Sequence, residues 1–308
     1  WAVNNSQYSG TITNCVFANG QDSAIRNSGS TPRISGCSFV NNVANYHGGA
    51  IQDVGSRPVL TDCVFSNNVA VVGGALYGYD SGLTLECCVF QANRSSGGGG
   101  GAVYSYTYND FTLDCLIRNC LFLDNQSASA GGAITEYGNR LRVLNCTFAR
   151  NRSESGGGAL DHSGDYGLVA NSILWNNTDS GGGTHGRSLE QAQILVGPGT
   201  LTVSNSCVQG LAQFAGHGNL GYDPLFVDHG SDDYHLTAIS PALGGGDPDL
   251  LDGATTDLEA NARTRSGGPG SGLDMGAYQF QGVPGAPVAV CGLPSSASIC
   301  SIGDVVSF

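Results

Sequence analysis

Residues 141–160 read LRVLNCTFARNRSESGGGAL, and variants of this string recur along most of the chain. The unit contains an aliphatic pair, Asn-Cys-x-Phe, an Asn three residues after the Phe, a small polar loop and Gly-Gly-Ala-Leu. Self-similarity at a period of about 20 to 50 residues is typical of a solenoid rather than a globular domain. We therefore interpret this unit as one coil of a parallel β-helix.

Aligning the repeats on the Asn-Cys pair gives eight coils, spaced 22 to 34 residues apart. The residue two positions before the Asn is aliphatic in every coil, as expected for a strand with one buried face. The Asn position itself predicts a bend, because Asn and Gly tolerate a left-handed backbone. This bend column contains Asn14, Gly36, Asp62, Cys87, Asn119, Asn145, Asn171 and Asn205.

A second Asn column follows the Phe of each repeat by three residues. Stacked strands lie about 4.8 Å apart, so amide side chains at one position of successive coils can hydrogen-bond into a ladder. The predicted ladder contains Asn42, Asn68, Asn93, Asn125, Asn151 and Asn177.

Six cysteines occupy one inward column, and Ser replaces them in the last two coils. The column contains Cys15, Cys37, Cys63, Cys88, Cys120 and Cys146. We interpret them as buried free thiols, because Cys packs as a small hydrophobe; a ladder of disulfides is the alternative. Cys291 and Cys300 flank a short loop and are predicted to pair, whereas Cys87, Cys115 and Cys207 have no assigned role.

The charge balance limits the classes of partner. Formal net charge is −13, from 25 acidic and 12 basic residues, and every basic residue is Arg. An acidic surface argues against nucleic acid and anionic membranes, which positive charge attracts. No stretch of about 20 apolar residues predicts a membrane span. The first residues, beginning at Trp1, read as the tail of a coil, so we expect earlier coils to be missing or removed.

Two stretches resemble known families. The pairing of Phe-x-x-Asn with Gly-Gly-Ala-[Ile/Leu/Val], from about Ile12 to Asn177, resembles the repeats of bacterial polymorphic outer-membrane (Pmp-like) proteins. The string from Asp223 to Phe280, including Asp274-Met-Gly-Ala-Tyr-Gln-Phe280, is similar to the C-terminal end of secreted right-handed parallel β-helix proteins of the choice-of-anchor Q type. These resemblances imply an exported bacterial surface or extracellular protein, and they imply no particular reaction.

We therefore predict an all-β, right-handed parallel β-helix of about eight coils with a loop-rich C-terminal cap. Residues 1–209 form the coils and residues 210–280 the cap. Residues 281–308 are a linker and the first strand of a further β domain, or a tail that pairs with another subunit. Within the cap, we expect Asp257, Arg263 and Asp274 to form an ion pair or network.

The positions after each Gly-Gly-Ala strand are candidates for a functional face. They are rich in tyrosine, which is enriched at recognition sites, so we hypothesise a surface that binds a glycan or another subunit. Ordinary cross-strand stacking is the alternative. The predicted cluster contains Tyr77, Tyr79, Tyr104, Tyr106 and Tyr137.

A carbohydrate-active lyase or hydrolase needs converging carboxylates, or carboxylates with Arg and Ca²⁺. The nearest cluster is Asp161, His162 and Asp165, which we place in one loop without an acidic partner on the adjacent coil, so no catalytic residue is assigned. No metal site or cofactor is predicted. The acidic pairs Asp232-Asp233 and Asp247-Pro-Asp249 could hold Ca²⁺, but we interpret them as solvated loops.

These observations favour a non-catalytic extracellular structural protein of a bacterial cell surface. We expect a self-assembling fibre or surface-layer subunit, with head-to-tail or lateral contacts between copies. A glycan- or host-binding adhesin using the Tyr cluster is the first alternative, and a polysaccharide lyase or hydrolase the second.

Overall fold

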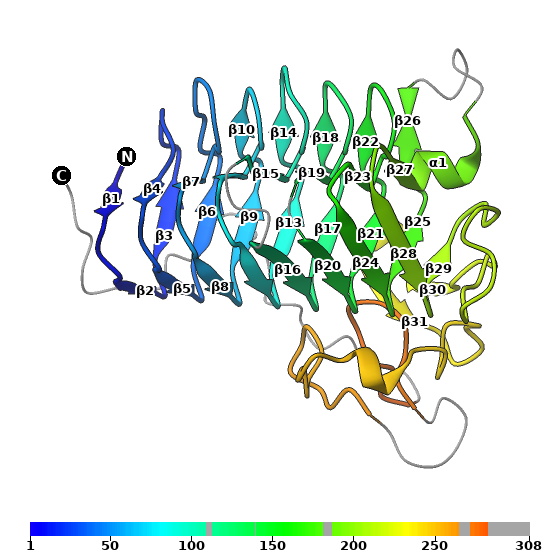
Figure 1. The fold of residues 1–308 in the computed structure, drawn as a ribbon. Coiled ribbons are helices and arrows are strands. Elements are labelled where there is room, and N and C mark those ends of the chain that lie inside the picture. The colour runs from blue at the N-terminus through cyan, green and yellow to red at the C-terminus, as the bar shows by residue number, and fades with distance from the viewer. Residues whose placement is uncertain (109–112, 139, 181–186, 265–271, 283–308) are drawn as a thin grey trace.

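In a computed structural model the chain forms a parallel β-solenoid (Figure 1), which confirms the predicted fold class. The structure describes residues 1–108, 113–138, 140–180, 187–264 and 272–282. Three sheets, here named A, B and C, each contain eight strands, and all neighbouring strands within them are parallel. The chain visits A, B and C in turn and then starts the next coil, so its backbone hydrogen bonds run between coils.

The strands are short, as the repeat predicts. Sheet A contains β1 (Val3–Ser6), β4 (Ile25–Ser28), β7 (Ile51–Val54), β11 (Leu76–Tyr79), β15 (Val103–Tyr106), β19 (Ile134–Tyr137), β23 (Leu160–His162) and β27 (Ile194–Val196). Sheet B contains β2 (Thr11–Thr13), β5 (Arg33–Ser35), β8 (Val59–Thr61), β12 (Thr84–Glu86), β16 (Asp114–Arg118), β20 (Arg140–Leu144), β24 (Tyr166–Ala170) and β28 (Thr200–Ser204). Sheet C contains β3 (Val16–Ala18), β6 (Ser38–Val40), β9 (Val64–Ser66), β13 (Val89–Gln91), β17 (Leu121–Leu123), β21 (Thr147–Ala149), β25 (Ile173–Trp175) and β29 (Cys207–Val208).

The remaining elements are smaller. A fourth sheet, D, contains β10 (Val69–Ala70), β14 (Arg94–Ser95), β18 (Gln126–Ser127), β22 (Arg152–Ser153) and β26 (Thr178–Asp179). Helix α1 (Leu189–Gln193) precedes the last strand of sheet A. The C-terminal region contains the antiparallel pair β30 (Phe226–Asp228) and β31 (Asp233–Leu236), and the 3₁₀ turns η2 (His229–Ser231) and η3 (Pro248–Leu250).

The bend column forms the corner between sheets B and C. All eight residues have positive φ, from 46° at Asn205 to 60° at Gly36. Asn, Asp and Gly accept this left-handed conformation at low cost, and Cys87 adopts it with φ 51°. The corner is therefore a local property of each repeat.

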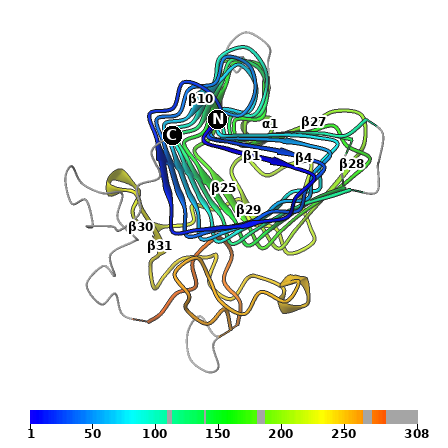
Figure 2. The ribbon, with the colours of Figure 1, turned by 90° about the vertical axis from the view of Figure 1, so that its left-hand side faces the viewer.

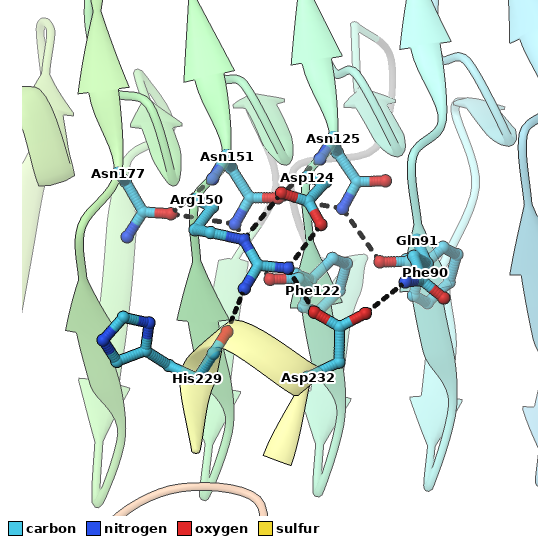
Figure 3. A network of polar contacts seen from close by, with 10 residues as sticks. All are labelled: Phe90, Gln91, Phe122, Asp124, Asn125, Arg150, Asn151, Asn177, His229 and Asp232. Carbon is cyan, nitrogen blue, oxygen red and sulfur yellow. Dashed lines mark hydrogen bonds and ion pairs between the residues drawn. The ribbon is translucent and has the colours of Figure 1, made fainter. Parts of the chain in front are cut away.

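The core consists of ordered stacks. The rings of successive Phe residues, from Phe17 to Phe148, lie 4.6 to 5.0 Å apart between centroids and are nearly parallel. In the second Asn column, each Nδ2 donates to Oδ1 of the next Asn at 2.9 to 3.0 Å, and Figure 3 shows the part from Asn125 to Asn177. Gln193 of α1 ends this ladder by accepting from Asn177 Nδ2 at 2.8 Å.

The cysteines of the inward column are free thiols, as are all nine cysteines in the described part of the chain. Each Sγ of the column donates to the carbonyl two residues earlier at 3.2 to 3.4 Å. Cys115 and Cys207 are buried, and burial raises the pKa of Cys207 to about 12. Cys291 and Cys300 lie outside the described residues, as does most of the predicted C-terminal tail.

The C-terminal region does more than cap the stack. Leu211 and Phe214 pack against the last coil of the core, and Glu190 of α1 accepts three backbone N–H groups from residues 212–214 at 2.8 to 3.1 Å. The described residues from β30 to residue 264, together with residues 272–282, instead lie along the outer face of sheet C (Figures 1 and 2). The outer face of sheet C is apolar at β17, where Leu121 and Leu123 are buried against Tyr234 and Tyr278.

An ionic network holds η2 against the coils (Figure 3). Arg150 donates to both carboxylate oxygens of Asp124, at 2.8 and 2.7 Å, to the carbonyl of His229 at 2.5 Å, and to Asp232. Gln91, two coils away, also donates to Asp232 at 3.1 Å. The acidic turn is thus part of an interface within the chain.

The predicted network of Asp257, Arg263 and Asp274 has a different form. Arg263 is fully buried and donates to the side chain of Asn119 and to the carbonyls of Gly276 and Ala277. Asp257 and Asp274 are linked through Gln279, whose backbone N–H and Nε2 each donate at 2.8 Å. Arg263 therefore joins the C-terminal region to the corner of the β-helix.

Candidate binding face on sheet A

The outward positions of sheet A form two rows of side chains along the solenoid. β-strand alternation points Ile51 into the core and its neighbour Gln52 outward, and the parallel register repeats this in each coil. The first row contains, in register, Asn4, Arg26, Gln52, Tyr77, Tyr104, Thr135, Asp161 and Leu195. The second row contains Val54, Tyr79, Tyr106 and Tyr137.

The structure brings all five predicted tyrosines together. The rings of Tyr77 and Tyr104 are stacked, with centroids 5.6 Å apart and planes 5° apart. The other rings are not stacked. The ring planes of Tyr79 and Tyr106 are 41° apart, and those of Tyr106 and Tyr137 meet edge to face at 73°. All five side chains are partly exposed. We call this set the Tyr row.

Asp161 lies at one end of the Tyr row. Tyr137 donates its hydroxyl to Oδ2 of Asp161 at 3.0 Å, and Asp161 is only 3 % exposed. Burial raises the pKa of this carboxyl to about 6, and it raises the pKa of Tyr104 to about 12. Tyr104 therefore remains a neutral hydrogen-bonding group at physiological pH.

A pocket of about 400 Å³ lies at the opposite end of the Tyr row, and the sequence did not predict it. His47 connects the two, because its ring stacks on Tyr77 with centroids 4.2 Å apart. The sequence contains only a weak signal for this pocket, because its lining side chains come from turns as well as strands. The pocket is lined by Trp1, Asp22, Ser23, Arg26, Asn45, Tyr46, His47 and Gln52.

The predicted cluster of Asp161, His162 and Asp165 is not a cluster in the structure. Asp161 and His162 lie on strand β23, not in a loop, and therefore point to opposite faces of sheet A. His162 points into the core, where its Nδ1 lies 2.6 Å from Oε2 of Glu136, and both side chains are fully buried. Asp165 is exposed in the following turn.

Glu136 and His162 belong to a polar column inside the β-helix that the sequence analysis missed. Its register is Asn5, Asn27, Asp53, Gly78, Ser105, Glu136 and His162. Asn27 donates to Asp53 at 2.6 Å, and burial raises the pKa of Asp53 to about 7. The sequence pattern could have revealed this polar column, because each of its residues follows an inward aliphatic residue by two positions in a sheet A strand.

The carboxylates of sheet A do not form a pair on its outer face. Among the described outward positions of its strands, Asp161 is the single carboxylate, and Glu136 is inward. General acid–base cleavage of a glycosidic bond uses two carboxyl groups facing the substrate. The outer face is therefore suited to contact with a ligand through aromatic rings and hydroxyl groups, because its one carboxylate is buried.

Several acidic residues of the C-terminal region have protein partners. Asp232 pairs with Arg150, Asp233 lies 2.6 Å from His235, and Asp252 lies 3.0 Å from Arg142. Asp247 caps the turn η3. Within the described ranges, no group of three or more His, Cys, Asp or Glu side chains is placed to hold a metal ion. No helix in those ranges is long and apolar enough to cross a membrane.

A protein family described as "Right handed beta helix region" matches residues 2–126. This segment contains the first part of the stack, from β1 to β17. Comparison with curated proteins gives no match. The match agrees with the parallel β-helix seen in the structure and extends to the fold alone, since β-helix proteins include both enzymes and non-enzymes.

Proposed function

We propose that this β-helix is a non-catalytic extracellular protein that binds a glycan along the outer face of sheet A. The observation that carries the proposal is the Tyr row, in which ring and hydroxyl groups lie partly exposed and in register on three successive strands, β11, β15 and β19. Tyrosine offers a rigid apolar ring with a polar tip, which suits a ligand that has both apolar faces and hydroxyl groups.

The spacing of the coils supports a chain-like ligand. Successive strands lie about 4.8 Å apart, which is close to the length of one sugar unit in an extended polysaccharide. A glycan lying parallel to the solenoid axis would therefore meet equivalent side chains at each unit. Asp161, at the end of the row, is buried and accepts the hydroxyl hydrogen bond of Tyr137, which fixes the position of that ring.

Cross-strand stacking also explains part of the Tyr row. Tyr77 and Tyr104 cover each other's faces, and such pairs stabilise a sheet without any ligand. The tilted rings of Tyr79, Tyr106 and Tyr137 cover each other less completely. We therefore assign the ligand contact to Tyr79, Tyr106 and Tyr137, which belong to the second row of sheet A.

The test is glycan binding by the double variant Tyr79→Ser/Tyr106→Ser, measured by affinity electrophoresis and on a glycan array. We expect at least a tenfold loss of affinity, because aromatic side chains dominate such contacts. The matched control is Tyr222→Ser, which removes a tyrosine that is 72 % exposed outside sheet A. Binding by the double variant equal to that of the wild type would contradict the proposal.

The same variant separates a glycan from a second copy of the chain. Loss of self-association in sedimentation, with glycan binding unchanged, would assign the Tyr row to contacts between copies. Assembly into a fibre or surface layer on a bacterial cell stays a prediction. Electron micrographs of dispersed monomers alone would argue against it.

A further inference from the structure

The pocket at the start of the Tyr row is organised around Arg26. This residue occupies an outward position of β4, in register with Asn4 on one side and Gln52 on the other. Its guanidinium lies 5.8 Å from the centre of the Trp1 ring, within the range of a cation–π contact. Arg26 thus continues the row that leads through Gln52 to Tyr77.

In the part of the chain that the structure describes, Arg26 has no anionic partner. Among the residues that the structure describes it forms no ion pair, and its Nε is buried without a hydrogen-bond acceptor. A buried donor with no acceptor costs free energy. A carboxylate matches the planar fork of a guanidinium and accepts two parallel hydrogen bonds from it.

The rest of the pocket suits a sugar ring. Tyr46 is 72 % exposed, and His47 presents a ring whose pKa burial lowers, so that it is neutral near pH 7. Gln52 and Asn45 supply amide donors and acceptors. The volume of about 400 Å³ lies within the range of sites that enclose small ligands.

The charge of the pocket favours a single carboxylate over a polyanion. Asp22 also lines the pocket, with its Oδ1 accepting the backbone N–H of Ser23 at 2.9 Å. One cation and one anion give no excess positive charge, and the net charge of −13 repels polyanions at long range. Recognition therefore depends on short-range contact with Arg26.

We propose that this pocket holds one carboxylate-bearing sugar residue, with its carboxylate bound by Arg26, at the end of a glycan that continues along the Tyr row. The inference rests on the proposed function, because it names the class of glycan that the face selects. It also assigns a direction: the acidic residue lies at the Arg26 end and hydroxyl-rich residues lie towards Asp161.

The test compares matched ligands on the full chain. Neutral oligosaccharides that carry a single glucuronate, galacturonate or mannuronate residue at one end are each paired with the carboxyl-reduced oligosaccharide of the same length, in which a hydroxymethyl group replaces the carboxylate. We expect the wild type to bind at least one acidic member about tenfold more tightly than its reduced partner, as charge-assisted hydrogen bonds predict. Arg26→Gln should remove this preference and leave binding of the reduced oligosaccharide unchanged.

The control is Arg33→Gln, which removes an exposed arginine from β5 of sheet B and should leave the preference intact. If Arg26→Gln fails to fold, as judged by circular dichroism, Arg26→Lys keeps the charge without the planar fork and should reduce the preference severalfold. Equal binding of acidic and reduced ligands by the wild type, or an unchanged preference in the Arg26 variants, overturns the inference alone. Absence of binding to every oligosaccharide overturns both the inference and the glycan function.

Discussion

The guanidinium of Arg263 donates two hydrogen bonds to Oδ1 of Asn119, from Nε at 3.1 Å and from Nη2 at 2.6 Å, across a sequence separation of 144 residues. Asn119 is a bend residue with φ 54°, so one side chain serves both a corner and an interface. Asn171 has the same double role, because it exchanges hydrogen bonds with the backbone of Asp247 at 2.8 and 3.0 Å. The C-terminal region is therefore attached to the β-helix through its bends.

Arg263→Met should detach this region before the coils unfold. The substitution leaves Asn119 and the carbonyls of Gly276 and Ala277 buried without donors, at a cost of about 3 kcal/mol or more. Hydrogen exchange should show protection lost first between β30 and residue 280, and urea unfolding should shift to lower concentration. Arg94→Met, at an exposed position of β14, is the control. Unchanged exchange in the C-terminal region would contradict the anchoring role.

Asn125→Ala should break the amide ladder in its middle. Asn125 donates to the carbonyl of Phe90 and to Asn151, and it accepts from the backbone and side chain of Asn93. Because these partners are buried, we expect a loss of about 3 kcal/mol in the free energy of unfolding. Asn45→Ala, at an exposed position, should change it by less than about 0.5 kcal/mol. Equal losses in the two variants would show that the ladder adds no stability.

Cys120→Ser should be tolerated in the inward column. Ser172, two coils on, already donates to the carbonyl of Ala170 at 2.8 Å and accepts from the backbone of Cys146 at 3.1 Å. The change should therefore cost less than about 1 kcal/mol, the size of one typical hydrogen bond. Since the described cysteines are free thiols, a reductant should leave the melting temperature of the coils unchanged. A large drop on reduction would instead support a disulfide ladder.

The stability of the protein should fall as pH rises from about 4 to 7 because of Asp53. Burial raises the pKa of this carboxyl from 3.8 to about 7, although the hydrogen bond from Asn27 opposes the shift. The folded chain therefore keeps a proton that the unfolded chain releases, which costs roughly 4 kcal/mol once the pH exceeds the folded pKa.

Asp53→Asn cannot ionise and should reduce this pH dependence, leaving the smaller part that Asp161 contributes through its own raised pKa. Urea unfolding between pH 4 and 8 measures the effect, with Asp165→Asn, at an exposed carboxyl, as the control that keeps the wild-type slope. A slope in Asp53→Asn equal to that of the wild type would show that another group carries the dependence.

The architecture follows from local signals that repeat. Each unit contains its own bend residue, strand and stacking positions, so the alignment of Asn145 with its seven equivalents predicts the coil without any long-range information. The Tyr row was predicted for the same reason, since strand alternation and register place equivalent residues side by side. Asp161 and His162 were misplaced because the boundary between loop and strand in β23 has no strong local signal.

By itself the sequence determined the solenoid, its corners, its Phe and Asn stacks and the row of tyrosines, because all of these repeat with the coil. Only the tertiary structure decided what depends on contacts between non-equivalent positions. Arg263 finds Asn119, the segment from β30 packs on Leu121 and Leu123, and turns from different coils surround Arg26. The repeat does not predict these contacts, because each one depends on where a loop that occurs once in the chain meets the stack of coils.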